Sequence, residues 1–73
     1  MNKGKSRTLV RVPKFHRGDH VIFDFGMRPV TGEVIEDRGT IGVGGRRLFS
    51  VRFPFDEGID TIIELPEEEL EMA

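Results

Sequence analysis

Apolar and polar side chains alternate along several short segments of the chain, and this period of two is typical of half-buried β-strands. The two clearest segments are residues 20–25 and residues 46–53. Their predicted core faces carry only valine and phenylalanine: Val21, Phe23, Phe25, Phe49, Val51 and Phe53. We therefore expect these side chains to form the centre of a hydrophobic core.

Two further segments, residues 30–37 and residues 59–65, show the same alternation. Their core faces would carry Val30, Gly32 and Val34 in the first, and Ile59, Thr61, Ile63 and Leu65 in the second. A glycine inside a strand indicates a bend or bulge, as expected where a small sheet curls. Residues 8–12 have strand-like composition, and we expect them either to add a short edge strand or to lie along the barrel. Pro13 limits pairing there, because proline cannot donate a hydrogen bond to a ladder.

The connections between these segments contain turn residues. Residues 38–45 include four glycines and predict a long loop, and residues 54–58 predict a turn. Residues 66–70 predict a single helical turn, because Pro66 suits the first helical position and the carboxylates after it favour the positive end of the helix dipole. We expect Leu70 to fold back against the core.

The fold class predicted by this pattern is all-β: a small curled antiparallel barrel of four or five strands with a single helical turn at its C-terminal end. A rolled sheet buries the phenylalanines, whereas a flat sheet leaves one face wet. We expect residues 1–13 to form a basic, flexible arm, with or without the short edge strand, and residues 14–73 to form the barrel domain. Self-association would help so small a core, since it leaves little stability to spare.

Three motifs resemble those of the SH3-like small barrels. They are the opening Phe15-x-x-Gly18-Asp19-x-Val21, Gly32 within the second strand, and the closing Leu65-Pro66-x-x-x-Leu70. In that group a Gly-Asp-x-Val turn leads into the first core strand, and a Pro-x-x-x-Leu turn closes the sheet. The resemblance covers about residues 14–72, and it implies a fold without implying one function.

Two groups of similar layout allow a comparison residue by residue. The type II dihydrofolate reductases are tetramers around a central pore, and their functional strand reads Val-Gln-Ile-Tyr. The matching segment here is Thr61-Ile62-Ile63-Glu64, which keeps an isoleucine and lacks both the glutamine and the tyrosine. The resemblance therefore does not carry the activity over. The KOW-type barrels of ribosomal and transcription proteins share a similar opening turn, and nothing in the chain is diagnostic of them.

The composition suits one small core. The chain has 73 residues, of which 37% are apolar and 33% are charged. The longest run of large apolar side chains is the three residues Val21–Phe23, so no segment is expected to span a membrane. A basic N-terminus without an apolar stretch predicts a cytoplasmic location. The chain has no cysteine, which excludes a disulfide framework, a thiolate metal site and a thiol nucleophile.

The charges are divided unevenly along the chain. The net charge of −2 combines +5 for residues 1–20, +1 for residues 21–53 and −8 for residues 54–73. Such asymmetry favours a partner of opposite charge. The alternative is that both ends are solvated or that they neutralise each other across the fold, because exposed ion pairs contribute only about 0–1 kcal/mol.

Catalytic and metal sites have little support in the sequence. His16 and His20, with Asp19 between them, offer nitrogen and oxygen ligands, but a structural zinc site requires four ligands. Ser6 and Ser50 have no histidine near them in the sequence that would activate a nucleophile. The C-terminal carboxylates are expected in an exposed turn, which does not favour acid catalysis. We expect no metal, no cofactor and no enzyme activity from a single chain.

The candidates for partner binding are three arginines and one phenylalanine: Arg38, Arg46, Arg47 and Phe55. The arginines flank a glycine-rich segment, residues 38–47, whose backbone N–H groups would approach a phosphate or carboxylate held between guanidinium groups. The alternative is a plain hairpin loop in which Ile41 and Val43 pack back onto the barrel. Phe55 lies past the predicted strand, where it would either anchor a protein interface or cap the open end of the barrel.

These features favour a non-catalytic binding or accessory module that docks on a protein partner or on copies of itself. The first alternative is a nucleic-acid-binding barrel, with phosphate contacts from the basic arm: Lys3, Lys5, Arg7 and Arg11. The absence of Tyr and Trp weighs against it, because small barrels stack single-stranded bases on aromatic side chains. The second alternative is an enzyme subunit whose site forms only on assembly.

Overall fold

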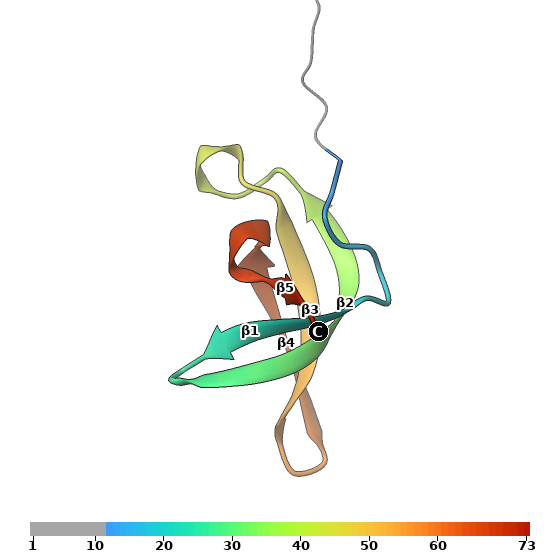
Figure 1. Ribbon diagram of the computed structural model, residues 1–73, viewed down its shortest axis with the longest axis vertical. Coiled ribbons are helices and arrows are strands. Elements are labelled where there is room, and N and C mark those ends of the chain that lie inside the picture. Colours follow the sequence, from blue (N-terminus) through green and yellow to red (C-terminus); the bar gives the residue numbers. More distant parts are fainter. Residues whose placement is uncertain (1–11) are drawn as a thin grey trace, which may run out of the picture.

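The fold is a single antiparallel sheet. The computed structural model describes residues 12–73, so the short strand expected at residues 8–12 and the arm residues Lys3, Lys5, Arg7 and Arg11 lie outside the described residues. Figure 1 shows the five strands β1 (His20–Phe25), β2 (Arg28–Gly39), β3 (Leu48–Asp56), β4 (Ile59–Pro66) and β5 (Glu71–Met72). Their spatial order is β4-β3-β2-β1-β5, and every neighbouring pair is antiparallel.

The predicted all-β class is confirmed, and so is the single helical turn near the C-terminus, a 3₁₀ turn over Glu67–Glu69. The turn expected over residues 54–58 is shorter than predicted and lies at residues 57 and 58, because β3 continues to Asp56. The last pairing of β3 with β2 is at Arg52, so Pro54 is paired only with Asp60 of β4. A proline is tolerated at position 54 because β2 does not pair with this part of β3, so no neighbouring strand on that side needs a hydrogen bond from the missing N–H.

The sheet is strongly curled, and β2 bends most. The register between β2 and β3 shifts twice, between Val34 and Glu36 and between Asp37 and Gly39, as expected at β-bulges. The backbone of β3 also passes very close to Gly32, where a Cβ would lie 2.6 Å from Val51 Cγ1 and 2.9 Å from the Arg52 carbonyl oxygen. The bend or bulge predicted at Gly32 lies further along β2, and Gly32 itself permits a close approach of the two strands.

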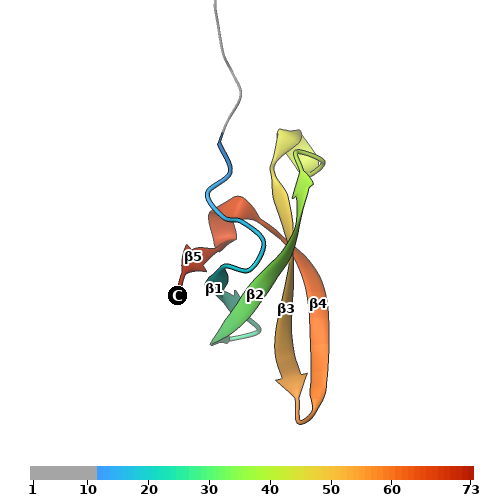
Figure 2. The same cartoon turned by 90° about the vertical axis from the view of Figure 1, so that its right-hand side faces the viewer.

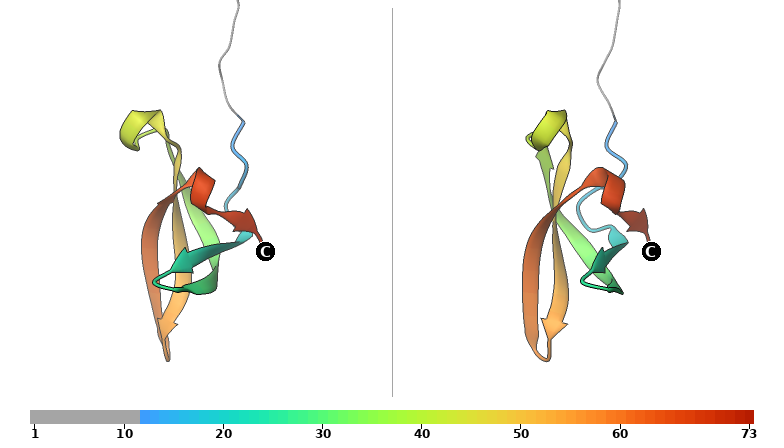
Figure 3. Two further views of the ribbon diagram at one scale, coloured as in Figure 1. Left: turned by 60° about the vertical axis from the view of Figure 1, so that its left-hand side comes forward. Right: turned by 90° about the vertical axis from the view of Figure 1, so that its left-hand side faces the viewer.

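The curled sheet is compatible with a small β-barrel-like fold, although hydrogen bonds do not close it into a continuous ladder. Strands β4 and β5 form its two edges. Figure 2 and Figure 3 show the β1–β2 hairpin and the β3–β4 hairpin diverging towards their turns, with β5 lying beside β1. One end of the sheet is therefore more open than the other.

The core fills the inside of the curl. It consists of eight buried apolar side chains: Phe15, Val21, Phe23, Val34, Phe49, Val51, Phe53 and Leu70. Phe15 meets the ring of Phe49 edge-on at 5.7 Å between centroids, and Phe23 meets Phe53 edge-on at 5.2 Å. These are favourable geometries for aromatic pairs, worth about 0.5–1.5 kcal/mol each beyond the area they bury. The predicted burial of Val21, Phe23, Phe49, Val51 and Phe53 is confirmed, and Leu70 packs against them as expected. Phe25 is only half-buried. The prediction that Ile59 lies on the core face is wrong, because this residue lies at the β3–β4 turn and is 59% exposed.

One carboxylate departs from the expectation of an exposed C-terminal turn. Glu67 is 7% exposed, whereas Glu68 and Glu69 are exposed. The Glu67 backbone N–H donates to the Arg47 carbonyl oxygen at 2.9 Å, and this bond draws the start of the helical turn onto the end of the core. Pattern alone does not reveal the burial, because it depends on contacts between distant segments.

Candidate functional site

Three phenylalanine rings meet at the open end of the curled sheet. Phe25 lies 5.0 Å from Phe53 and 5.4 Å from Phe55 between ring centroids. Phe53 is buried, but Phe55 is 60% exposed although it follows Phe53 on the same face of β3. The apolar face of β3 therefore runs past the edge of the core, and its last ring is covered on only one side.

A groove lies beside these rings, between the turn of the first hairpin and the end of β3. Its volume is about 370 Å³, and it is lined by Phe25, Gly26, Met27, Arg28, Pro29, Val30, Phe53, Pro54 and Phe55. We call its apolar lining the aromatic groove and define it as Phe25, Met27, Val30, Pro54 and Phe55.

Met27 marks how open the aromatic groove is. Its side chain is 98% exposed, because Gly26 and Met27 form the two-residue connection between β1 and β2. Gly26 supplies the positive φ of 69° that this tight connection uses. A flexible thioether at the lip of an aromatic surface adapts easily to the shape of a bound group. The sequence contained a signal for this residue, an apolar side chain placed at a hairpin tip.

The glycine-rich segment forms the opposite end of the molecule, and Figure 1 shows it above the sheet in yellow-green. We call residues 38–47 the glycine loop. The Asp37 carboxylate accepts two hydrogen bonds from Arg47 Nη1, at 2.9 and 2.7 Å, and one from the Gly39 N–H at 2.8 Å. Two backbone bonds brace the tip: the Gly42 N–H donates to the Arg46 carbonyl oxygen, and the Gly45 N–H donates to that of Gly42. The loop is therefore held in one shape.

The electrostatics at the base of the glycine loop favour an ionised Asp37. Partial burial by itself would raise the pKa of this carboxyl, but the hydrogen bond from Gly39 and the Arg47 guanidinium outweigh that effect and lower the pKa below 3.8. The Asp37–Arg47 pair is partly shielded, with side-chain exposures of 32% and 20%. The pair therefore fastens the two strands where they enter the loop.

The tip of the glycine loop presents two aliphatic side chains to solvent. Ile41 is 62% exposed and Val43 is 92% exposed, so the alternative in which both pack back onto the barrel is wrong. The space against the sheet is taken by Gly42 instead. A Cβ on Gly42 would lie 3.0 Å from Leu48 Cδ2, which shows how closely the backbone approaches there.

The four predicted partner-binding residues do not form one surface. Arg38 pairs with Glu64 at 2.9 Å and Arg47 pairs with Asp37, whereas Arg46 is exposed and makes no ion pair with another residue of the described part of the chain. Phe55 follows Arg47 by eight residues of extended chain, which span about 26 Å. Two of the three arginines expected to clamp an anion are therefore paired with carboxylates of the chain itself. Phe55 lies at the aromatic groove, at the opposite end of β3 from the glycine loop.

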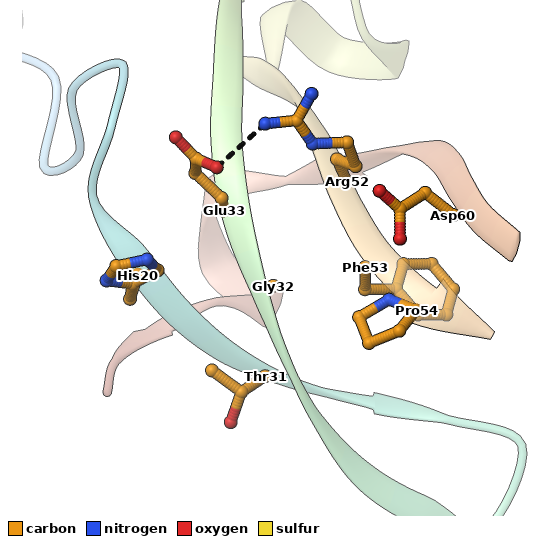
Figure 4. A pocket seen from close by; sticks show the side chains of 8 residues that line it. All are labelled: His20, Thr31, Gly32, Glu33, Arg52, Phe53, Pro54 and Asp60. Carbon is orange, nitrogen blue, oxygen red and sulfur yellow. Dashed lines mark hydrogen bonds and ion pairs between the residues drawn. The ribbon is translucent and has the colours of Figure 1, made fainter. Parts of the chain in front are cut away.

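A second hollow, on the outer face of the sheet, is lined by polar and charged side chains as well as Phe53 and Pro54. Figure 4 shows Glu33 of β2 and Arg52 of β3 joined by an ion pair of 2.9 Å, with Asp60 near Pro54 and His20 apart from the pair on β1. Its lining contains one hydroxyl, Thr31, and one imidazole, His20, and no hydrogen bond joins these two described side chains as nucleophile and base. Ser50 is buried at 5% exposure, and His16 and Asp19 lie in a turn where the His16 N–H donates to Asp19.

Within residues 12–73, no group of three or more His, Asp or Glu side chains is arranged to hold a metal ion. No helix in that part of the chain is long and apolar enough to cross a lipid bilayer. The chain matches no protein-family model, no curated protein and no solved structure.

Proposed function

We propose that this chain is a small non-catalytic module that binds protein, and that the aromatic groove is its contact surface. The observation that carries the proposal is the exposure of Phe55. This ring continues the core-facing side of β3 and packs edge-on against Phe25, yet 60% of it is open to solvent. A partner that covers it extends the core of the module.

The groove has the make-up of an interface centre. Aromatic residues and methionine are enriched at such centres, and a few of them supply most of the binding free energy. Each 100 Å² of apolar surface removed from water contributes about 2.5 kcal/mol before the costs of association. A partner side chain seated between Met27 and Phe55 would remove apolar surface on both molecules. We therefore expect the partner to insert a large aliphatic or aromatic side chain.

The charge of the described domain favours a protein partner over a nucleic acid. Residues 12–73 carry seven basic and thirteen acidic side chains, a net charge of −6. Nucleic acids need a basic surface to neutralise their phosphates. The groove itself is lined by one charged residue, Arg28, and Asp56 and Glu57 follow its last residue, Phe55, in the chain. These two carboxylates suit a peptide that carries a basic residue beside its apolar anchor.

The proposal extends to the fold type and the location of the chain. We infer that the curled sheet is an SH3-like small barrel, which the motifs at Gly18-Asp19-x-Val21 and Leu65-Pro66-x-x-x-Leu70 support. We also infer a cytoplasmic location, which the lack of cysteine supports. The alternative to a binding module is an enzyme subunit whose site forms only when several copies assemble, with the β4 segment Thr61–Glu64 lining that site.

The test is a selection of peptides from a random displayed library on the immobilised chain. We expect the selected peptides to share a large apolar residue flanked by Lys or Arg. Their affinity should fall about tenfold or more for Phe55→Ser, because loss of a central interface side chain costs upwards of about 1.4 kcal/mol. The matched control is Ile62→Ser, which removes a side chain of nearly equal exposure, 59%, outside the groove.

The control decides the outcome. Peptides that bind Phe55→Ser as tightly as the unchanged chain would contradict the proposal, as would peptides whose binding is lost only in Ile62→Ser. A selection that enriches no peptide would also count against a protein-binding groove. Circular dichroism of both variants verifies that each remains folded.

A further inference from the structure

The two ends of the molecule both expose apolar side chains, one in a groove and the other on a projecting loop. One end offers a concave apolar surface, the aromatic groove, and the other offers a convex apolar tip with Ile41 and Val43 projecting from the glycine loop. Figure 1 shows these ends on opposite sides of the sheet, so one copy cannot bring its own tip into its own groove. A second copy can.

Hydrogen bonds brace the tip of the glycine loop and its base. Asp37 fastens the two strands at the base of the loop through Arg47 and Gly39, and the Gly42 and Gly45 N–H groups brace the tip itself. A surface already held in its bound shape loses little conformational entropy on association. An exposed pair of aliphatic side chains on a braced loop is therefore suited to insertion.

The charges beside the two surfaces are complementary. Arg46 lies beside the tip, is exposed, and makes no ion pair with another residue among 12–73. The groove is lined by one charged residue, Arg28, and lies beside the β3–β4 turn, where three carboxylates, Asp56, Glu57 and Asp60, are all exposed. Opposite potentials at the two surfaces favour their encounter and fix their orientation.

We propose that the aromatic groove binds the glycine loop of a second copy of this chain, with Ile41 and Val43 seated in the groove and Arg46 beside the acidic β3–β4 turn. The inference rests on the proposed function, because it names the partner of the same groove. The contact uses different surfaces on the two copies, so each pair still has one free tip and one free groove. Such association continues with concentration or closes into a ring, and it does not stop at a symmetric dimer.

The experiment uses two full-length variants that each disable one surface. Val43→Asp places a charge on the tip, and Met27→Asp places a charge in the groove. Both side chains are almost wholly exposed, at 92% and 98%, so neither change disturbs the core. Sedimentation velocity should show the unchanged chain growing in mass with concentration. Each variant alone should associate at least about tenfold more weakly.

Mixing the two variants is the decisive measurement. Val43→Asp keeps an intact groove and Met27→Asp keeps an intact tip, so an equimolar mixture should form a one-to-one heterodimer and go no further. Ile62→Asp, a charge placed on the outer face, should associate as the unchanged chain does. High salt should weaken each association, because the Arg46 contact is screened.

Three results would overturn the inference. They are an unchanged chain that stays monomeric at all concentrations, a dimer that both variants form as well as the unchanged chain, and a mixture that forms no heterodimer. Any of them leaves the peptide selection free to succeed, which would show a groove that binds another protein. Failure of both experiments would remove the proposed function itself.

Discussion

The backbone N–H of Lys14 donates a hydrogen bond to the Oε2 of Glu67 at 2.9 Å, joining two positions that are 53 residues apart in the chain. Glu67 in turn donates its own N–H to the Arg47 carbonyl oxygen. The carboxylate therefore ties the segment before β1 to the helical turn after β4. Strands β4 and β5 are the two edges of the sheet and do not pair with each other. The Glu67 contacts cover the end of the core between these edges.

Glu67→Ala should lower the free energy of unfolding by about 1–3 kcal/mol, because it leaves the Lys14 N–H without its acceptor in a partly buried position. Chemical denaturation measures the change, and hydrogen exchange of the Lys14 amide should quicken. Glu68→Ala is the matched control in the same turn, and it should change stability by no more than about 0.5 kcal/mol, as is usual for exposed positions. Equal losses in the two variants would contradict the role of Glu67.

Gly32→Ala should destabilise the fold by about 1–3 kcal/mol, the range for overpacking a tight site. The new methyl group would meet both Val51 and the backbone of Arg52, so β2 would have to move away from β3. Thermal or denaturant unfolding measures the effect, with the exposed neighbour Thr31→Ala as the control. A Gly32→Ala protein as stable as the unchanged chain would show that the strands are not in close contact.

Asp37→Asn should remove part of the acid dependence of stability. The folded pKa of Asp37 lies below the ordinary value of 3.8, so the ionised carboxylate stabilises the fold above that value. This contribution is lost as the pH falls through 3.8 towards the folded pKa. Unfolding curves between about pH 6 and pH 3 should show the gap between the unchanged chain and Asp37→Asn narrowing as the pH falls. A gap that widens with acid would contradict this sign.

Phe53 and Phe55 should differ sharply in their effect on stability although they lie two residues apart. Phe53→Ala removes a buried ring and should cost about 3–5 kcal/mol. Phe55→Ser removes a ring that is 60% exposed and should cost about 1 kcal/mol. Denaturant unfolding of both variants measures the difference. A cost for Phe55 as large as that for Phe53 would identify it as a core residue and not as a binding residue.

The strands could be predicted from the sequence because alternating side chains report directly on which face of a strand is buried. Val21, Phe23, Phe49, Val51 and Phe53 are all buried as the alternation requires. A bulge in β2 was predicted from its internal glycine, but the positions of the bulges, the length of β3 beyond Pro54 and the burial of Glu67 were not predictable. Each depends on contacts between segments far apart in the chain, which a local pattern does not record.

The candidate site was predictable only in part. Phe55 was identified because it lies at the end of an apolar strand face, but Met27 was missed because its importance depends on the first hairpin approaching the end of β3. The three arginines of the glycine loop were predicted to bind an anionic group of a partner. Arg38 and Arg47 face Glu64 and Asp37 in the fold, and such pairing follows from the strand registers and not from the spacing of the residues.

Amide chemical shifts of the isotope-labelled chain during titration with a selected peptide map the binding surface directly. We predict that the largest shifts occur at residues 25–30 and 53–56, and that they vanish in Phe55→Ser. Shifts confined to the polar hollow around Glu33 and Arg52, with residues 25–30 and 53–56 unmoved, would contradict it.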